Sequence, residues 1–244
     1  MKKLAIVLFL FVLLCYFVAA ISFLNRANKA LVCSGVEIVM EDSARGRFIS
    51  EADVLQMLDE GKCNPVGLLI DSVELGRIKD ELRECPWIEK IVVYKTPGGK
   101  VCIHLNQRRP ILRVMPDGGK DYYIDREGKI IPRSAFVAEL AVATGKITKE
   151  YACGELAVLG RFIQDDAFWN DQIEQINVLA DGEVELVPRV GGHVILLGAA
   201  ADVENKLNRM KEFYVKGLKK AGWNKYSQIS LKYDDQIICK RNKK

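Results

Sequence analysis

The sequence has little of what most enzymes use for catalysis. Its 244 residues include two histidines, His104 and His193, each in a strand-like run that favours a structural role over a metal pair. The phosphate-binding GxxxxGK, the zinc-binding HExxH and the GxSxG nucleophile motif are all missing. Adjacent carboxylates occur at Asp165-Asp166 and Asp234-Asp235, but sequence neighbours need not flank one scissile bond. We therefore predict no catalytic residues, no metal, no cofactor and no small-molecule substrate.

A regular cysteine framework is also missing. The seven cysteines form an odd set without a CxxC pair, which argues against zinc binding and against a disulfide scaffold. Cys102 and Cys239 lie among β-branched residues and are predicted to be small buried hydrophobic residues. In an oxidising compartment this pattern is consistent with no disulfide bridge, and equally with one or two.

No strong excess of charge marks a nucleic-acid surface. The chain has 36 basic and 32 acidic residues, and setting aside Lys2 and Lys3 leaves 34 against 32. Four of these basic residues lie at the C-terminus, namely Lys240, Arg241, Lys243 and Lys244. The body is therefore close to neutral, and we expect no nucleic-acid partner. Residues 242–244 are predicted to be a solvated basic tail.

One long apolar run stands at the start of the chain. It extends from Leu4 to Leu24, is broken only by Ser22, and ends abruptly at Asn25-Arg26. About 21 residues at roughly 1.5 Å rise each cover roughly 30 Å, the thickness of the hydrocarbon core of a bilayer. We predict a transmembrane helix over residues 4–24. The flanking segments are then a cytoplasmic tail, residues 1–3, and a juxtamembrane linker, residues 25–35.

A cleaved secretory signal is the alternative for this run. Val18-Ala19-Ala20 could serve as a cleavage site and would leave Ile21 as the mature N-terminus. The run is longer than the roughly 7–15 apolar residues of a typical signal, so a retained anchor is favoured. Lys2 and Lys3 give a weak positive-inside bias that keeps the short tail in the cytoplasm. In either case the rest of the chain crosses the membrane.

Residues 36–106 are predicted to form a small α+β domain. Val36–Met40 alternates loosely and indicates a strand. A helix is expected to begin at Ser50, which can cap it together with Asp53 at the third helical position, and to end at Gly61.

A second helix and a hairpin complete this domain. The helix is expected to begin at Asp71 and to stop before Pro86, which cannot continue it. Two alternating runs, Ile88–Lys95 and Lys100–Leu105, then flank the turn Thr96–Gly99. The predicted order is therefore β-α-α-β-β.

Residues 107–241 are predicted to form a mixed β domain with two helices. One helix is expected over Tyr151–Ile163, and the other from a cap at Asp202 to Gly222. Alternating runs between turn dipeptides indicate three strands, Ile173–Val178, Glu183–Pro188 and His193–Leu197. Ser227–Lys240 holds either a final pair of strands or one long bent strand.

The order of these segments resembles a known family. A β-α-α-β-β block just outside a single N-terminal anchor looks like a POTRA domain. The motifs Glu84–Ile91, Val101–Leu105, Gln107–Pro110 and Tyr122–Pro132 resemble those of FtsQ/DivIB bacterial cell-division proteins, over nearly the whole chain. The resemblance implies a non-enzymatic divisome scaffold: a single-pass type II protein of the cell inner membrane, mostly periplasmic and located at the division septum.

The resemblance also implies partners and a docking site. FtsB- and FtsL-type division proteins would bind by adding a strand to a sheet edge, which would help to control septal peptidoglycan synthesis. Leu231-Lys232-Tyr233 matches the Asp-Leu-Arg-Tyr pattern of the family, with Ser230 in place of the Asp. We predict that Ser227–Tyr233 forms this edge. The predicted partner-binding residues are Ile229, Ser230, Leu231, Lys232, Tyr233, Ile237 and Ile238.

Other functions share some of these features. An outer-membrane biogenesis or secretion factor also uses POTRA domains, but it needs a C-terminal series of amphipathic strands of ~10 residues each, for which this chain lacks the length. A secreted cell-wall-binding protein would have lost the anchor, and a cell-wall enzyme would need converging carboxylates or a metal cluster. The FtsQ/DivIB-type scaffold is the preferred interpretation.

Overall fold

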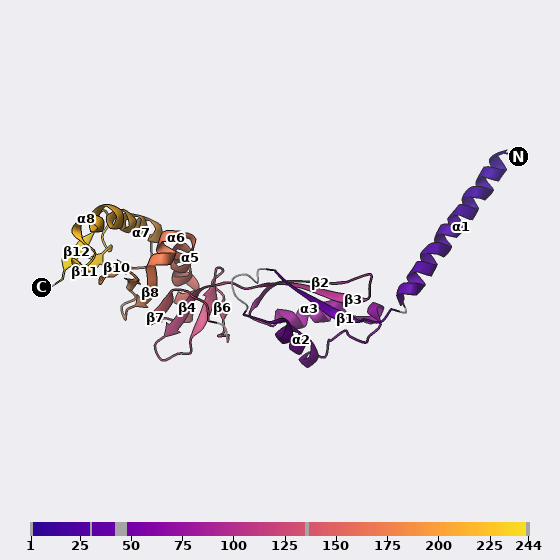
Figure 1. The fold of residues 1–244 in the computed structure, drawn as a ribbon, viewed down its shortest axis with the longest axis horizontal. Helices are drawn as coiled ribbons and strands as arrows, with labels where there is room; N and C mark the ends of the chain where they lie inside the picture. The colour runs from indigo at the N-terminus through magenta and orange to yellow at the C-terminus, as the bar shows by residue number, and fades with distance from the viewer. Residues whose placement is uncertain (1, 30, 42–47, 135–136, 243–244) are drawn as a thin grey trace. The chain divides into compact units, whose positions relative to one another are not determined.

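The computed structural model shows a mixed α+β chain, which confirms the predicted class (Figure 1). It describes residues 2–29, 31–41, 48–134 and 137–242. The chain divides into two compact units, Met1–Gln107 and Arg108–Lys244.

Helix α1, Lys2–Lys29, contains the apolar run. In the described parts of the chain, no helix was found to combine the length and the apolar character of a membrane span. The transmembrane segment at residues 4–24 stays a prediction.

The first unit contains a three-stranded sheet in the order β1-β3-β2. Its strands are β1 (Gly35–Glu41), β2 (Ile88–Lys95) and β3 (Lys100–Gln107). β1 runs parallel to β3, whereas β2 and β3 form an antiparallel hairpin. The predicted first strand and hairpin are confirmed. At the turn, the Gly99 N–H donates to the Thr96 carbonyl at 3.1 Å.

Helix α2, Glu51–Glu60, begins and ends where the sequence predicts. The Asp53 N–H donates to Ser50 Oγ at 3.2 Å, and the Ser50 N–H donates to Asp53 Oδ2 at 2.7 Å. This reciprocal pair is a capping box, which satisfies backbone donors that the first helical turn leaves free. The hydrogen bonds from the Ser50 side chain and backbone hold the pKa of Asp53 below its usual value. Gly61 follows the last helical residue.

The second helix begins later than predicted. Asp71 lies in a separate 3-10 turn, η2 (Ile70–Ser72), and helix α3 runs over Leu75–Arg83. Between them the backbone is extended at Val73 (φ −69°, ψ 120°), so the two stretches cannot form one helix. In Figure 1, α2 and α3 lie on one face of the sheet. Core side chains fill the space between these helices and the sheet, among them Val54, Leu58, Ile78, Leu82, Ile103 and Leu105.

The second unit is built on a nine-stranded sheet in the order β12-β11-β10-β9-β8-β7-β4-β5-β6. The strands are β4 (Pro110–Pro116), β5 (Tyr122–Asp125), β6 (Ile130–Ile131), β7 (Val142–Gly145), β8 (Ile173–Val178), β9 (Val184–Pro188), β10 (Val194–Gly198), β11 (Tyr226–Ser230) and β12 (Ile238–Arg241). Three neighbouring pairs, β4–β7, β7–β8 and β10–β11, are parallel and the others antiparallel. The three predicted strands correspond to β8, β9 and β10, and the segment after Ser227 forms a pair.

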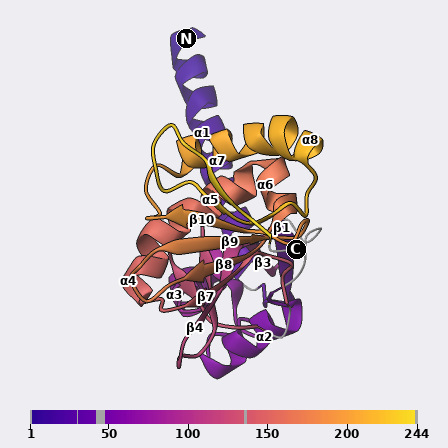
Figure 2. The same cartoon turned by 90° about the vertical axis from the view of Figure 1, so that its left-hand side faces the viewer.

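Helices α5 to α8 lie together on one side of this sheet (Figures 1 and 2). The first helical stretch comprises α4 (Lys149–Tyr151), η3 (Ala152–Leu156) and α5 (Ala157–Asp165). The second comprises α7 (Val203–Glu212), η4 (Phe213–Leu218) and α8 (Lys219–Ala221). Both contain a π-helical turn, at η3 and η4. Both helices were predicted. The short helix α6 (Ala167–Gln172), which Asp166 caps through the N–H groups of Phe168 and Trp169, was not.

The predicted cap of α7 at Asp202 is wrong in its mechanism. Asp202 adopts a left-handed conformation (φ 53°, ψ 40°), and its side chain makes no capping bond to the backbone. It accepts instead from the Asn205 side-chain amide at 2.7 Å. Gly222 (φ 92°) ends the stretch as predicted, in a region where glycine carries no steric penalty.

All seven cysteines are unpaired. Cys102 is 3% exposed, which confirms its predicted burial. Cys239 is only partly buried, because it lies on the last strand of the sheet, so that prediction was too strong.

Candidate partner-binding edge

The predicted free edge at Ser227–Tyr233 is not an edge in the structure. Strand β11 pairs on both sides, parallel with β10 and antiparallel with β12. Its ladder stops at Ser230, and Tyr233 has already left the sheet. The prediction was wrong because the final hairpin supplies a second neighbour for β11.

The open edge belongs to β12. No strand among the described residues pairs with its outer side. At its inner side Ser230 is paired with Ile238, and Ile229 with Cys239. An unpaired edge exposes a row of backbone donors and acceptors that can bind an added strand.

The outward backbone groups of β12 can be assigned from its hydrogen bonds. The Asn242 N–H donates to the Lys225 carbonyl at 3.1 Å, so this amide faces β11. Backbone groups of an antiparallel strand face alternate sides at successive residues, which directs Lys240 toward β11 as well. The N–H and C=O groups of Cys239 and Arg241 therefore point to the open side.

The seven predicted partner-binding residues fall into two groups. Ile229, Ser230 and Leu231 are buried. Tyr233 and Ile238 are 57% and 48% exposed. Lys232 is also exposed, and Ile237 is partly buried against the core. The structure thus brings Ile237 and Ile238 to the open strand but places Ile229–Leu231 one strand further in.

Helix α7 holds the loop between β11 and β12. Arg209 Nη1 donates to the Tyr233 carbonyl at 3.0 Å, and Arg209 Nη2 donates to the Leu231 carbonyl at 3.4 Å. Lys232 forms an ion pair with Glu183, whose hydrogen bond raises the pKa of the lysine. These contacts fix the segment that leads into β12.

Sequence reasoning placed Lys240 and Arg241 in the β domain but missed them as parts of the edge, because the edge was assigned to Ser227–Tyr233. Their signal was the apolar run Ile237–Cys239 directly before them. Both side chains are exposed, as is Lys216 on the neighbouring η4. A hollow of about 410 Å³ lies between η4 and the loop, lined by Arg209, Glu212, Phe213, Lys216, Gly217, Asp235 and Ile237. The edge therefore combines free backbone groups, apolar side chains and positive charge.

The two histidines have structural partners. His104 Nε2 lies 3.1 Å from Tyr94 Oη, and its Nδ1 lies 3.8 Å from Glu41. His193 is buried, and its Nε2 lies 2.7 Å from Tyr214 Oη. Burial lowers the pKa of His193, so its ring is neutral near pH 7.

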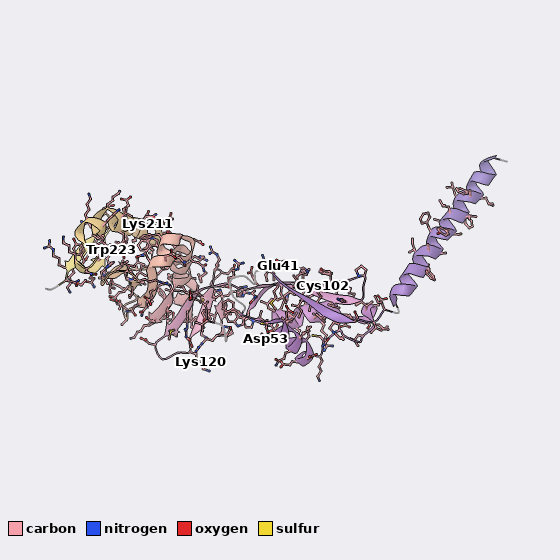
Figure 3. The ribbon with its side chains drawn as sticks, in the orientation of Figure 1. Glu41, Asp53, Cys102, Lys120, Lys211 and Trp223 are labelled. Atoms are coloured by element: carbon pink, nitrogen blue, oxygen red, sulfur yellow. The ribbon has the colours of Figure 1, made fainter. Side chains whose placement is uncertain are left out.

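The first pair of adjacent carboxylates is accounted for by structural contacts, and the second lies in a turn. Asp165 pairs with Arg126 at 2.7 Å, while Asp166 caps α6 and pairs with Lys211 of α7 at 2.8 Å (Figure 3 labels Lys211). Asp235 lies in a turn with φ 59°. Across the described residues, no group of three or more His, Cys, Asp or Glu side chains is arranged to hold a metal ion.

Comparison with known families assigns both units. A model described as POTRA-like domain matches residues 31–106, and a model described as FtsQ/DivIB, C-terminal related, matches residues 109–240. The chain belongs to the FtsQ/DivIB family. No curated protein matches it. FtsQ/DivIB proteins are non-catalytic scaffolds at the division site, so membership indicates a role in cell division.

Proposed function

We propose that this FtsQ/DivIB-family protein is a non-enzymatic scaffold of the divisome. It binds FtsB- and FtsL-type partners and thereby helps to control septal peptidoglycan synthesis. The observation that carries the proposal is the open β12 edge, in a chain whose two folded units match a POTRA-like domain and the FtsQ/DivIB C-terminal domain.

The proposal includes a retained anchor in the cell inner membrane. The apolar run at residues 4–24 lies within α1 and is long enough for a bilayer of roughly 30 Å. Lys2 and Lys3 stay in the cytoplasm, and both folded units lie in the periplasm.

Partner capture uses the β12 edge. A partner strand pairs with the outward N–H and C=O groups of Cys239 and Arg241. Each ladder hydrogen bond contributes only about 0.5–1.5 kcal/mol net, so side chains must add affinity. Ile237 and Ile238 offer apolar surface beside the strand, and Tyr233 offers a ring with a polar tip, a frequent anchor at interfaces. Ile229, Ser230, Leu231 and Lys232 support this edge from the adjacent strand and loop.

The test is co-purification from solubilised membranes, with identification of bound proteins by mass spectrometry. Arg241→Pro deletes one outward donor while an edge strand still tolerates proline. Arg241→Ala is the matched control, since it removes the side chain and keeps the donor. We expect FtsB- and FtsL-type proteins to co-purify with the unaltered chain and with Arg241→Ala. Much less of them should co-purify with Arg241→Pro. Recovery of no division protein with the unaltered chain would refute the proposed function.

A further inference from the structure

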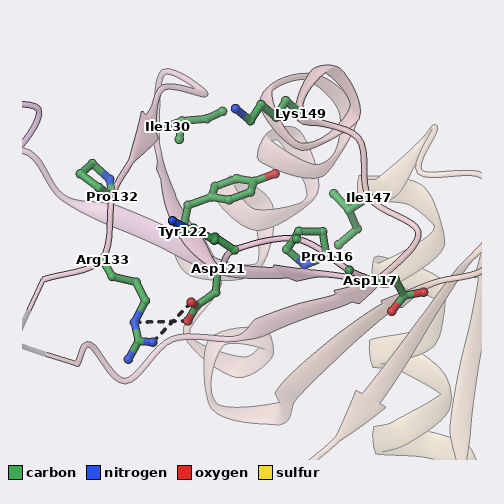
Figure 4. Close-up of a pocket in the computed structure, with 12 residues that line it drawn as sticks. Pro116, Asp117, Asp121, Tyr122, Ile130, Pro132, Arg133, Ile147 and Lys149 are labelled. Atoms are coloured by element: carbon green, nitrogen blue, oxygen red, sulfur yellow. Dashed lines mark hydrogen bonds and ion pairs between the residues drawn. The ribbon is translucent and has the colours of Figure 1, made fainter.

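A second hollow lies at the other end of the nine-stranded sheet, beside β5 and β6 (Figure 4). Its volume is about 840 Å³. Because β6 and β12 are the opposite ends of the strand order, this hollow is separate from the β12 edge. It is lined by the β4–β5 turn, by residues flanking β6 and by the loop that leads into α4.

The walls of the hollow are largely apolar. Pro116, Tyr122, Ile130, Pro132 and Ile147 line it. Tyr122 is 7% exposed, and its hydroxyl has no hydrogen-bond partner among the described residues. In Figure 4 the ring lies amid the labelled side chains, with the hydroxyl on the side of Ile147 and Lys149. The hydroxyl oxygen is closed off from solvent, so a ligand acceptor reaches it once the side chains beside it shift. The new bond would then recover the about 1–3 kcal/mol that a buried hydroxyl without a partner costs.

The charges at the rim do not balance. Asp121 is shared by two arginines, Arg113 at 2.6 Å and Arg133 at 3.3 Å. The hydrogen bonds from Arg113 and the charges of both arginines hold the pKa of Asp121 below its usual value. Lys120 and Lys149 also line the hollow, both are exposed, and neither has an ion-pair partner in the described chain. The exposed carboxylate of Asp117 lines the hollow too. Two carboxylates, Asp117 and Asp121, thus face three cations, those of Lys120, Arg133 and Lys149. The rim therefore keeps a small positive excess around an apolar floor.

We infer that this hollow binds an extended segment of a second protein partner that carries an aliphatic or aromatic side chain beside carboxylates. The apolar side chain occupies the floor, a peptide carbonyl accepts from the Tyr122 hydroxyl, and the carboxylates pair with Lys120 and Lys149. Polar rims that complement the charge of a partner increase the association rate and specificity, while the apolar floor supplies affinity. A scaffold with this site holds two partners at once, one at each end of its sheet.

The experiment uses the full chain in detergent and fluorescence anisotropy with a labelled Asp-Phe-Leu-Asp peptide, blocked at both ends. Comparison probes are Lys-Phe-Leu-Lys, Asp-Ser-Gly-Asp and vesicles of phosphatidylglycerol. The double variant Lys120→Glu/Lys149→Glu should weaken binding of the acidic apolar peptide by about tenfold or more. Lys146→Glu is the matched control, because Lys146 is exposed in the same loop but does not line the hollow, and it should change affinity by less than about twofold.

Tyr122→Phe separates a ligand-binding role from a purely structural one. If the hydroxyl only forms part of the core, its removal leaves binding unchanged and raises or preserves the melting temperature. We expect instead a severalfold loss of affinity, with the melting temperature again preserved or raised, so the affinity is the readout that separates the two roles. The inference would be overturned if the double variant and Tyr122→Phe both bound the acidic apolar peptide as tightly as the unaltered chain does. It would also be overturned if the chain bound only the anionic vesicles, or bound all three peptides equally.

Discussion

Arg209 gives the sharpest test of how the fold supports the β12 edge. Its guanidinium donates to two loop carbonyls, those of Leu231 and Tyr233, at 3.4 and 3.0 Å. Arg209→Ala removes both hydrogen bonds, so the two carbonyl oxygens can then bond only to water. A hydrogen bond to a charged donor contributes about 1.5–3 kcal/mol when buried and less when exposed. Because the Tyr233 bond is exposed, we expect a total loss of about 2 kcal/mol.

This loss should be local. A change of about 2 kcal/mol increases the opening equilibrium of the β11–β12 hairpin roughly 30-fold. Hydrogen exchange followed by mass spectrometry on the full chain measures it, and Lys216→Ala is the control, since its ion pair with Glu212 is fully at the surface. We expect faster exchange over residues 226–241 and unchanged exchange over β7 and β8. Exchange that is the same in Arg209→Ala and Lys216→Ala would refute this account of the loop.

Three further predictions concern single side chains. Gly128→Ala should lower the free energy of unfolding by about 1–3 kcal/mol in urea titrations, because Gly128 has φ 76° and an added Cβ would collide with the Cys153 carbonyl. Burial lowers the pKa of His193 in the folded state, so below the usual histidine pKa of 6.5 the unfolded state binds a proton more readily than the folded state. The free energy of unfolding should therefore decrease as the pH falls from 6.5 to the lowered folded-state pKa, and His193→Gln should lose this part of the acid dependence. Tyr233→Ala should weaken binding of the FtsB-type partner by about 2 kcal/mol in calorimetry, with an unchanged circular dichroism spectrum.

Features set by neighbouring residues could be predicted from the sequence. The capping box at Ser50 and Asp53 and the hairpin around Thr96–Gly99 each depend on a few adjacent side chains, and both appear as expected. The start of α3 was misplaced because the acidic residue Asp71 also suits the 3-10 turn that precedes it.

The position of the sheet edge could not be predicted in this way. Alternation in Ser227–Tyr233 indicates a strand with one buried face, but it does not say which strands lie on either side. Here β10 pairs with β11 in parallel, although more than 25 residues lie between Gly198 and Tyr226. The hairpin partner β12 is short and ends in basic residues that are also typical of a disordered tail. Strand order is a nonlocal property, and only the folded structure identified Cys239 and Arg241 as the residues with outward backbone groups.

Hydrogen exchange at single amides of β12 tests whether a partner strand pairs with this edge. The measurement compares the full chain alone with the same chain bound to the extracytoplasmic segment of the proposed FtsB-type partner. We predict that the amides of Cys239 and Arg241 exchange rapidly in the free protein and become protected in the complex. The Leu231 amide, already bonded to the Leu196 carbonyl at 2.8 Å, should be protected in both states. A complex that forms with no added protection at Cys239 and Arg241 would contradict strand addition at this edge.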